Sequence, residues 1–548
     1  MQSSSLPLRA TLLLLASTWS RRKFLQAGGL AAASLLTGRT VSAAISGRGA
    51  ERLALAWVRP RNAADLTALA EFDLTHLARP GGLEVLLWPG DAAQLRATGI
   101  PHEITVGDLV GRDRALRVAS PSPRSARQPG ERGDYRALRD YEKDLHDLAS
   151  ARPDIARVFA LPEPSEAGRI TYGIEIAEAV RRPDGRPTLY VDGLHHAREW
   201  PSGEMAIMFA HDLVAGFGSD AQVTRLLQSL RVIVVPVMNV DGFTYSRTHL
   251  YDDNDYGRSY PAAYAGFGAY WRKNRRTLTQ DRGLGHLDGL AGYGVDNNRN
   301  YAVGFGGPGT SSNPAQTTYR GPSAFSEPET RNVGRVVLSR TVTAALSHHT
   351  YANLVLRPWG NTRDDSPDEP LLKSLGDAMA EHNEYTSQKG IDLYPTTGTM
   401  SDWAYAAVGA LGYTFEHGTD NFHPPYAAFI PENYARNRKP FLMLAEAAAD
   451  PAHHAVITGR TMRGGSGSEE AVIVRKAVSM ATEGGRHDDR LEIAISSQRD
   501  GRFEIHLGPS TPPLATSPEN YEVVAGRSAV PVVVARGERV DLGRIPVS

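Results

Sequence analysis

The sequence predicts an α/β domain with a mainly parallel or mixed β-sheet, preceded by a small α+β module and followed by a small β-sandwich. Three changes of pattern along the chain support this fold class. Short strand-like and helical runs alternate before residue 115, and buried-strand runs alternate with long amphipathic segments between residues 135 and 450. After Asp450, strand-like runs are separated by Gly, Pro and Asp, which is typical of an all-β fold.

The composition narrows the possible functions before any motif is considered. The chain of 548 residues carries 60 Lys+Arg against 61 Asp+Glu, and the formal net charge of −1 gives no electrostatic basis for binding nucleic acid or an anionic membrane. A hydrophobic share of 41% is that of an ordinary globular protein. Cysteine is absent, which excludes disulfides, a thiolate nucleophile and a Cys-ligated metal site.

Residues 1–44 have the pattern of a signal peptide. A pair of arginines at 21–22 stands directly before the apolar run 24–36, and small residues follow at 41–44. Paired arginines in this place are typical of the twin-arginine (Tat) export route. The alternative, a membrane helix, is disfavoured because the run is shorter than the roughly 20 apolar residues that a bilayer requires. We expect cleavage near the end of this segment and a periplasmic or extracellular protein.

The segment 45–115 is predicted to form the α+β module. Its strand-like and helical runs alternate, with strands expected at 53–58 and 83–88 and helices at 63–71 and 92–98. Segment 116–134 follows, rich in Pro, Ser and Arg and without periodicity. Such a composition is typical of an exposed linker that proteases can reach.

Segment 135–450 is predicted to be the central α/β domain. Its apolar runs of buried-strand type lie at 189–194, 232–238, 344–347 and 413–415. Between them, long amphipathic runs predict helices at 202–214, 327–338 and 434–448. Segment 451–548 is predicted to be the sandwich, with strands at 455–459, 471–475, 490–496, 502–507 and 529–534.

Three side chains have the chemistry of a zinc site. His196 and Glu199 follow the predicted strand 189–194 in H-x-x-E spacing, so both can reach one metal from a single turn. His349 follows another predicted strand and would complete a His₂Glu set with one open position. The pair His196–Glu199 taken alone is also compatible with an ordinary surface or core pair. We assign the neighbouring His195 and His348 to supporting roles.

Further polar residues follow the predicted strands or gather in two polar runs. Glu416 ends an apolar strand, where burial would raise its pKa toward that of a useful base; a buried Glu paired with Arg is the alternative. The run 270–276 is strongly basic, which is also typical of a solvated face. The run 294–301 is rich in Asn and Arg and could grip a carboxylate, although turn chemistry explains such a run as well.

Taken together, residues 135–450 resemble the zinc metallocarboxypeptidases of the carboxypeptidase A/B/T type, also called the M14 family. The resemblance is carried by the order and context of separate motifs: G-L-H-H-A-R-E, P-V-M-N-V-D-G-F, Y-W-R-K-N-R-R, G-V-D-N-N-R-N, T-Y-R-G-P-S-A-F-S-E-P-E-T, S-H-H-T-Y and Y-T-F-E. It implies a mixed, eight-stranded sheet flanked by helices. The N-terminal module resembles the propeptides of such enzymes, and the C-terminal segment resembles their transthyretin-like regulatory domain.

The resemblance also implies the roles of the residues at the metal. His196, Glu199 and His349 match the ligands of one Zn²⁺ per chain. Glu416 matches the general base that takes a proton from a zinc-bound water, the nucleophile of this family. Arg272 matches the arginine that polarises the scissile carbonyl and stabilises the oxyanion.

A second set of matches concerns the substrate. Asn298 and Arg299 match the pair that grips the terminal carboxylate, and Tyr394 matches the mobile tyrosine that caps the last residue. Asp296 matches the aspartate that orients the first histidine ligand, and Arg198 matches an arginine that lines the substrate groove.

The predicted function is therefore hydrolysis of the C-terminal peptide bond of peptides and proteins. Ser401 stands where relatives specific for basic residues have an acid, so we expect a neutral or apolar C-terminal residue. Peptide or protein C-termini are the expected partners, with no nucleic acid and, once the signal is removed, no membrane. The alternatives are an amidase, a deacylase or a cell-wall peptide hydrolase of the same fold, and a catalytically inactive binding protein.

Overall fold

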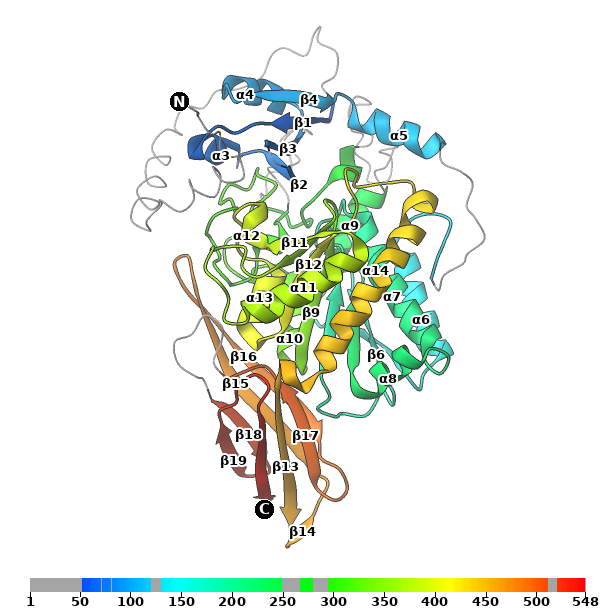
Figure 1. The fold of residues 1–548 in the computed structure, drawn as a ribbon, viewed down its shortest axis with the longest axis vertical. Helices are drawn as coiled ribbons and strands as arrows, with labels where there is room; N and C mark the ends of the chain where they lie inside the picture. Colours follow the sequence, from blue (N-terminus) through cyan, green and yellow to red (C-terminus); the bar gives the residue numbers. More distant parts are fainter. Residues whose placement is uncertain are drawn as a thin grey trace, which may run out of the picture. The chain divides into compact units, whose positions relative to one another are not determined.

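The computed structural model describes residues 52–69, 71–79, 81–119, 130–248, 267–278, 294–510 and 520–547. The described chain divides into two compact units, one up to Arg114 together with Phe267, and one from Ala115 onward (Figure 1). The predicted signal peptide and most of the predicted linker lie outside the described residues. Among the helices that the structure describes, none is both long enough and apolar enough to cross a bilayer.

The first unit contains a four-stranded sheet with short helices. Its strands are β1 (Ala54–Val58), β2 (Asp73–Arg79), β3 (Gly82–Leu87) and β4 (His102–Val106), in the order β2-β3-β1-β4. Helices α3 (Ala63–Leu69) and α4 (Asp91–Ala97) accompany the sheet, and apolar residues such as Phe72, Val85 and Leu95 form its core. Helix α5 (Leu109–Ala119) extends into the first residues of the predicted linker.

The second unit is built around a mixed sheet of eight strands, as expected. They are β5 (Ala156–Ala160), β6 (Tyr172–Ile176), β7 (Thr188–Asp192), β8 (Arg231–Val235), β9 (Val342–His349), β10 (Leu354–Arg357), β11 (Thr386–Lys389) and β12 (Leu411–Glu416). Their order is β11-β10-β12-β9-β7-β8-β6-β5. The central four strands, β12-β9-β7-β8, are parallel and buried, so their carboxyl ends meet at one edge.

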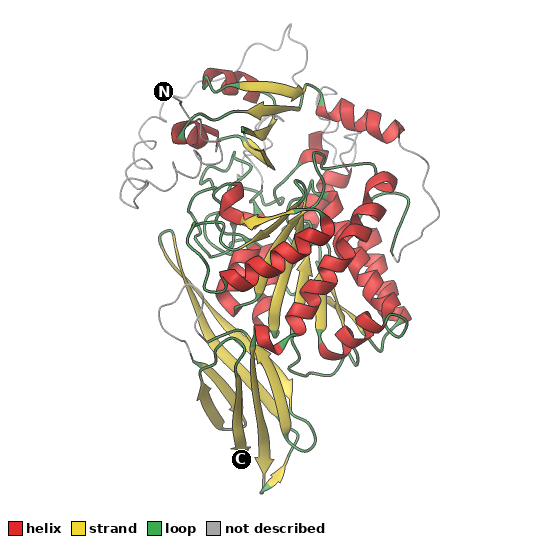
Figure 2. Ribbon diagram, viewed as in Figure 1, coloured by secondary structure: helices red, strands yellow, loops and turns green. Residues whose placement is uncertain are grey.

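Helices pack against this sheet (Figure 2). They are α6 (Leu138–Ala151), α7 (Trp200–Gly216), α8 (Ala221–Ser229), α9 (Val240–Thr248), α10 (Pro328–Leu338), α11 (Glu369–Asn383), α12 (Gly390–Leu393), α13 (Met400–Val408) and α14 (Tyr426–Ala449). Helices α7 and α14 pack on β7 and β9, and α13 packs on β9 and β12. Nearly all of α7 is buried, and most of its residues are apolar.

The C-terminal segment of the second unit is a sandwich of two four-stranded sheets. Its strands are β13 (Ala455–Arg463), β14 (Ser466–Gly467), β15 (Ala471–Thr482), β16 (Gly485–Ser496), β17 (Arg502–Leu507), β18 (Tyr521–Ala525), β19 (Ser528–Val532) and β20 (Arg539–Pro546). One sheet has the order β14-β13-β17 with β20 paired to β13, and the other has the order β16-β15-β18-β19. Along β15, buried and more exposed residues alternate, as the period of two requires.

Candidate active site

The loop after β7 places the first two candidate ligands. Leu194 adopts a positive φ of 56° and turns the chain out of the strand. Its N–H donates to the Ser202 hydroxyl at 2.9 Å, and the Asn239 amide donates to the carbonyl of His195 at 3.1 Å. Glu199 is the residue directly before α7. These bonds fix a tight connection that brings the side chains at 196 and 199 to the same side.

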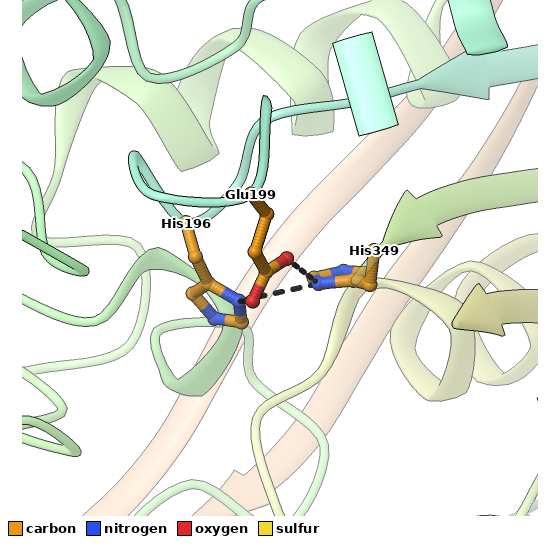
Figure 3. A group of neighbouring side chains, drawn as sticks. All are labelled: His196, Glu199 and His349. Atoms are coloured by element: carbon orange, nitrogen blue, oxygen red, sulfur yellow. Dashed lines mark hydrogen bonds and ion pairs between the residues drawn. The ribbon is translucent and has the colours of Figure 1, made fainter. Parts of the chain in front are cut away.

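His349 joins them from the end of β9, as Figure 3 shows. His196 Nδ1 lies 2.7 Å from Glu199 Oε1, His349 Nδ1 lies 2.9 Å from Glu199 Oε2, and the two Nδ1 atoms are 3.2 Å apart. All three side chains are buried. The three predicted ligands, which come from segments about 150 residues apart, therefore converge with one donor atom each.

The donor set fits zinc. Two imidazole nitrogens and one carboxylate are ligands that Zn²⁺ accepts, and bonds of about 2.0–2.2 Å around one ion place neighbouring donors a little over 3 Å apart. The three donor atoms found here all lie within 4.8 Å of one another. With three protein ligands, a tetrahedral ion keeps one position open for substrate or water.

Asp296 lies against the first histidine. Its Oδ1 lies 3.1 Å from His196 Nε2. Burial raises the pKa of Asp296, but the charge of Arg272 and the hydrogen bond with His196 outweigh this effect and hold the pKa well below its usual range. In the tautomer that leaves the Nδ1 lone pair available to the ligand cluster, the ionised carboxylate accepts the Nε2 proton. Burial, together with the charge of Arg272, lowers the pKa of His196 to about 4, so the imidazole is neutral at neutral pH.

A hydroxyl and a carboxylate that the sequence analysis did not single out support His349. Ser347 Oγ lies 3.1 Å from His349 Nε2 and donates to Asp192 Oδ1 at 2.7 Å. Ser347 stands two positions before His349 on β9, and Asp192 is its register partner on β7. Alternation along a strand places Ser347 and His349 on one face, so the S-x-H spacing was a usable signal. Asp192 could be recognised only once the strands were paired.

Glu416 lies directly beside this cluster. It ends β12 and is the parallel register partner of His349. Its side chain is buried, and burial raises the pKa of the carboxyl well above its usual value. A carboxyl in such an environment can accept a proton near neutral pH.

Arg272 is also brought to the cluster. Its Nε donates to Asp296 Oδ2 at 3.0 Å, and its Nη1 lies 3.8 Å from Glu199 Oε1. The side chain is buried. The guanidinium therefore lies between the carboxylate that supports His196 and the carboxylate of the ligand set.

Asn298 and Arg299 lie on the short 3₁₀ helix η5 (Asn297–Arg299), which Asp296 caps. Asn298 Nδ2 is 3.3 Å from His349 Nε2, and Asn298 Oδ1 accepts the N–H of Met400 at 3.0 Å. Arg299 donates from Nε to the Gly309 carbonyl at 2.9 Å and from Nη1 to the Asn298 carbonyl at 2.7 Å. Both side chains are buried, and these bonds leave further guanidinium N–H groups for a ligand.

The other two expected substrate residues are Tyr394 and Arg198. Tyr394 directly follows α12 and is half-buried; burial raises the pKa of its hydroxyl, and the charges that act on it include those of Arg299, Arg272 and Glu416. Arg198 lies over the ring of Phe422 at 4.4 Å.

Ser401 is paired with a second hydroxyl group. Ser401 lies in the first turn of α13 and accepts a hydrogen bond from Thr414 at 3.1 Å. Lys389 forms an ion pair with Asp365 and donates to the Arg363 carbonyl at 3.2 Å. Thus its charge is matched by a carboxylate outside the ligand cluster.

Comparison with known proteins agrees with this geometry. The model of the family described as zinc carboxypeptidase matches residues 141–438. Carboxypeptidase B of Homo sapiens is 30% identical over 258 residues, and carboxypeptidase A1 of Mus musculus is 31% identical over 259 residues; each match covers 45% of this chain and 55% of the relative. The chain thus spans about half the length of these curated relatives.

Solved structures show the same fold. The crystal structure of carboxypeptidase A from Helicoverpa armigera matches with a TM-score of 0.59 at 21% identity and covers 74% of this chain and 99% of that one. The structure of thrombin activatable fibrinolysis inhibitor matches with a TM-score of 0.56 at 22% identity, covering 73% and 99%. These likenesses confirm the expected metallocarboxypeptidase fold. With a family model that matches more than half of its length, the chain belongs to the zinc carboxypeptidase family.

Proposed function

We propose that this protein is a zinc-dependent metallocarboxypeptidase that removes the C-terminal residue from peptides and proteins. The observation that carries the proposal is the set of contacts around Asp296. Its carboxylate contacts His196 and Arg272 and accepts the backbone N–H of Asn298 at 3.0 Å. The buried Asp296 carboxylate thereby connects the ligand cluster with the Arg272 guanidinium, which can stabilise an oxyanion. It also connects both with the helical turn that carries the Asn298–Arg299 pair.

Residues of this chain account for each step in the hydrolysis of the C-terminal peptide bond. A zinc ion held by His196, Glu199 and His349 would supply Lewis acidity and lower the pKa of water to about 7. A carboxylate oxygen of Glu416 accepts a proton from the attacking water and later donates it to the leaving amine. The Arg272 guanidinium stabilises the negative charge that develops on the scissile carbonyl oxygen.

Exopeptidase action follows from the substrate residues. Arg299 and Asn298 hold the free carboxylate, and Tyr394 covers the last residue. Asn298 and Arg299 form a carboxylate clamp that lies next to His349. Only the last peptide bond can therefore be brought to the ligand cluster. Ser401 and Thr414 present hydroxyl groups, and this supports a preference for neutral or apolar C-terminal residues over Lys or Arg.

The test compares two versions of one short peptide, with a free carboxylate and with a C-terminal amide. Mass spectrometry with and without a chelator should show loss of the last residue from the free form only, and only without chelator. Replacing Arg299 with Met should abolish this difference by slowing cleavage of the free form. Cleavage of the amidated form at an equal rate, or release of an acyl group or cell-wall fragment instead, would contradict the proposal and favour the amidase or deacylase alternatives.

We further propose that the enzyme acts outside the cytoplasm, after Tat export. The twin arginines at 21–22 and the apolar run that follows support this location. Replacing both arginines with lysine should retain the precursor inside the cell. Unchanged export of that variant would dismiss the Tat route.

A further inference from the structure

The longest hairpin of the sandwich contacts the segment that follows the carboxylate clamp. Strands β15 and β16 pair along their whole length up to Thr482 and Gly485, so Glu483 and Gly484 form the turn (Figure 1). The N–H of Glu483 donates to the carbonyl of Phe305 at 2.9 Å. The Glu483 carboxylate forms an ion pair with Arg320. The turn is thus bonded to both ends of segment 305–320.

A second contact involves aromatic rings. His487 on β16 stacks on Phe325, with ring centres 4.8 Å apart and an angle of 25° between the planes. Phe325 in turn meets Tyr301 edge-on at 5.4 Å and Trp403 at 5.1 Å. The hairpin therefore also contacts the cluster of aromatic rings formed by Phe325, Tyr301 and Trp403.

Residues 301–309 are bonded directly to Arg299 of the carboxylate clamp and to the loop after Tyr394. The carbonyl of Gly309 accepts the Nε proton of Arg299, and the backbones of Tyr301 and Val303 bond to Gly398 at 3.1 Å and 2.8 Å. Thr397 donates to the Pro308 carbonyl at 3.1 Å. Segment 301–309 therefore lies between the hairpin turn on one side and both Arg299 and the loop after Tyr394 on the other.

The approach is close and the charges are complementary. A Cβ atom on Gly306, which has a φ of +86°, would lie 2.4 Å from Cβ of Glu483. Arg320 is only 13% exposed and lies over the ring of Phe305 at 4.9 Å, whereas the Glu483 side chain is 57% exposed. The glutamate thus supplies negative charge to a cation that is largely shielded from water.

We propose that this hairpin turn is a positioning device for the carboxylate clamp: Glu483 and His487 hold segment 301–325, and through it Arg299 and Tyr394, in place for the substrate. The inference rests on the proposed carboxypeptidase function and assigns the sandwich a part in substrate recognition. Glu483 acts through other residues and touches neither substrate nor metal. Its loss should therefore weaken binding of the terminal carboxylate more than it slows the chemical step.

The experiment measures kcat and KM on a peptide with a free C-terminus for four variants of the full chain. Glu483→Ala and Gly306→Ala disturb the contact from its two sides, and each should raise KM roughly tenfold while kcat changes less than about twofold. The charge-exchanged pair Glu483→Arg with Arg320→Glu should recover part of the loss. Glu492→Ala is the matched control, since it removes an exposed ion pair, with Arg475 at 3.0 Å, on the same hairpin.

The outcomes separate the two proposals. If the parent enzyme removes C-terminal residues but Glu483→Ala and Gly306→Ala have the KM of Glu492→Ala, the positioning role is wrong and the carboxypeptidase function stands. If the parent enzyme itself does not act on free C-termini, the proposed function fails. An equal fall of melting temperature in Glu483→Ala and Glu492→Ala, with a KM change in Glu483→Ala alone, supports positioning over a merely structural role.

Discussion

Asp296 illustrates how much of the chemistry depends on one side chain. The family resemblance predicts only its contact with His196. The structure adds Arg272 on its second oxygen and the cap of the helical turn that carries Asn298. Such sharing depends on how three separate segments meet, and no spacing within G-V-D-N-N-R-N encodes it.

The grouping of the three candidate ligands could be predicted from the sequence. His196, Glu199 and His349 each follow an apolar strand, and the structure brings their donor atoms together. Their neighbours were harder to assign. His348 contacts His417 at 3.0 Å, and His417 contacts Tyr385 at 3.1 Å, a buried polar chain that only the sheet pairing reveals.

Glu329 provides a test of buried electrostatics away from the metal site. It is buried beside Glu327, and the amide of Asn274 donates to both carboxyl groups, at 2.8 Å to Glu327 and 3.1 Å to Glu329. Glu327 is also paired with Arg276. Burial and the charge of Glu327 raise the pKa of Glu329 from its ordinary value of 4.5 to about 8.

A raised folded-state pKa stabilises the protein below the unfolded value of 4.5, and this contribution is lost as the pH rises toward 8. The wild type should therefore lose on the order of 3 kcal/mol of stability between pH 4.5 and pH 7 relative to Glu329→Gln, which carries no charge. Urea unfolding of both proteins at a series of pH values measures the difference. Parallel stability curves would show that Glu329 is ionised in the folded state.

At the scale of elements, parallel strand ends create the site. His349 and Glu416 are register partners at the ends of β9 and β12, and β7 leads to the loop of His196. The strands at the core of this arrangement were predicted because they are short apolar runs. Helix α13, β10 and β11 were not, since α13 is buried along its whole length and lacks an amphipathic pattern, and both strands have only four residues.

The loop that contains Gly309 lies in space between Arg299 and segment 394–398, and it allows a sharp test. Gly309 has a φ of +77°, and a Cβ there would lie 1.9 Å from the carbonyl oxygen of Pro395. Gly309→Ala should therefore displace the loop, cost about 1–3 kcal/mol of stability and raise KM for free C-termini. Gly464→Ala is the control, because Gly464 also has a positive φ of +57° but has open space around the added atom.

Thermal unfolding and steady-state kinetics on the two alanine variants give the answer. The backbone strain is common to both, so the difference between them reports the contact with Pro395 and its effect on Arg299. Equal KM values for Gly309→Ala and Gly464→Ala would show that the loop does not control the clamp.

At the scale of the whole molecule, the sandwich and the α/β sheet form one compact unit. Arg536 donates to Asp368 at 2.7 Å and to the Gly409 carbonyl at 3.0 Å, and Gly185 pairs with Ile505 in an isolated bridge. The strand-like runs after Asp450, separated by Gly, Pro and Asp, predicted the sandwich itself. Its attachment could not be predicted, because these contacts join positions more than 100 residues apart and follow no sequence period. The predicted domain boundaries stay predictions.

The account depends on one metal ion being bound by His196, Glu199 and His349. The most direct measurement is the zinc content of the purified chain, by elemental analysis, in wild type, His349→Ala and Glu416→Gln. We predict about one zinc per chain in wild type and in Glu416→Gln, which should lose turnover, and close to none in His349→Ala. Full zinc content in His349→Ala, or undiminished turnover in Glu416→Gln, would contradict the account.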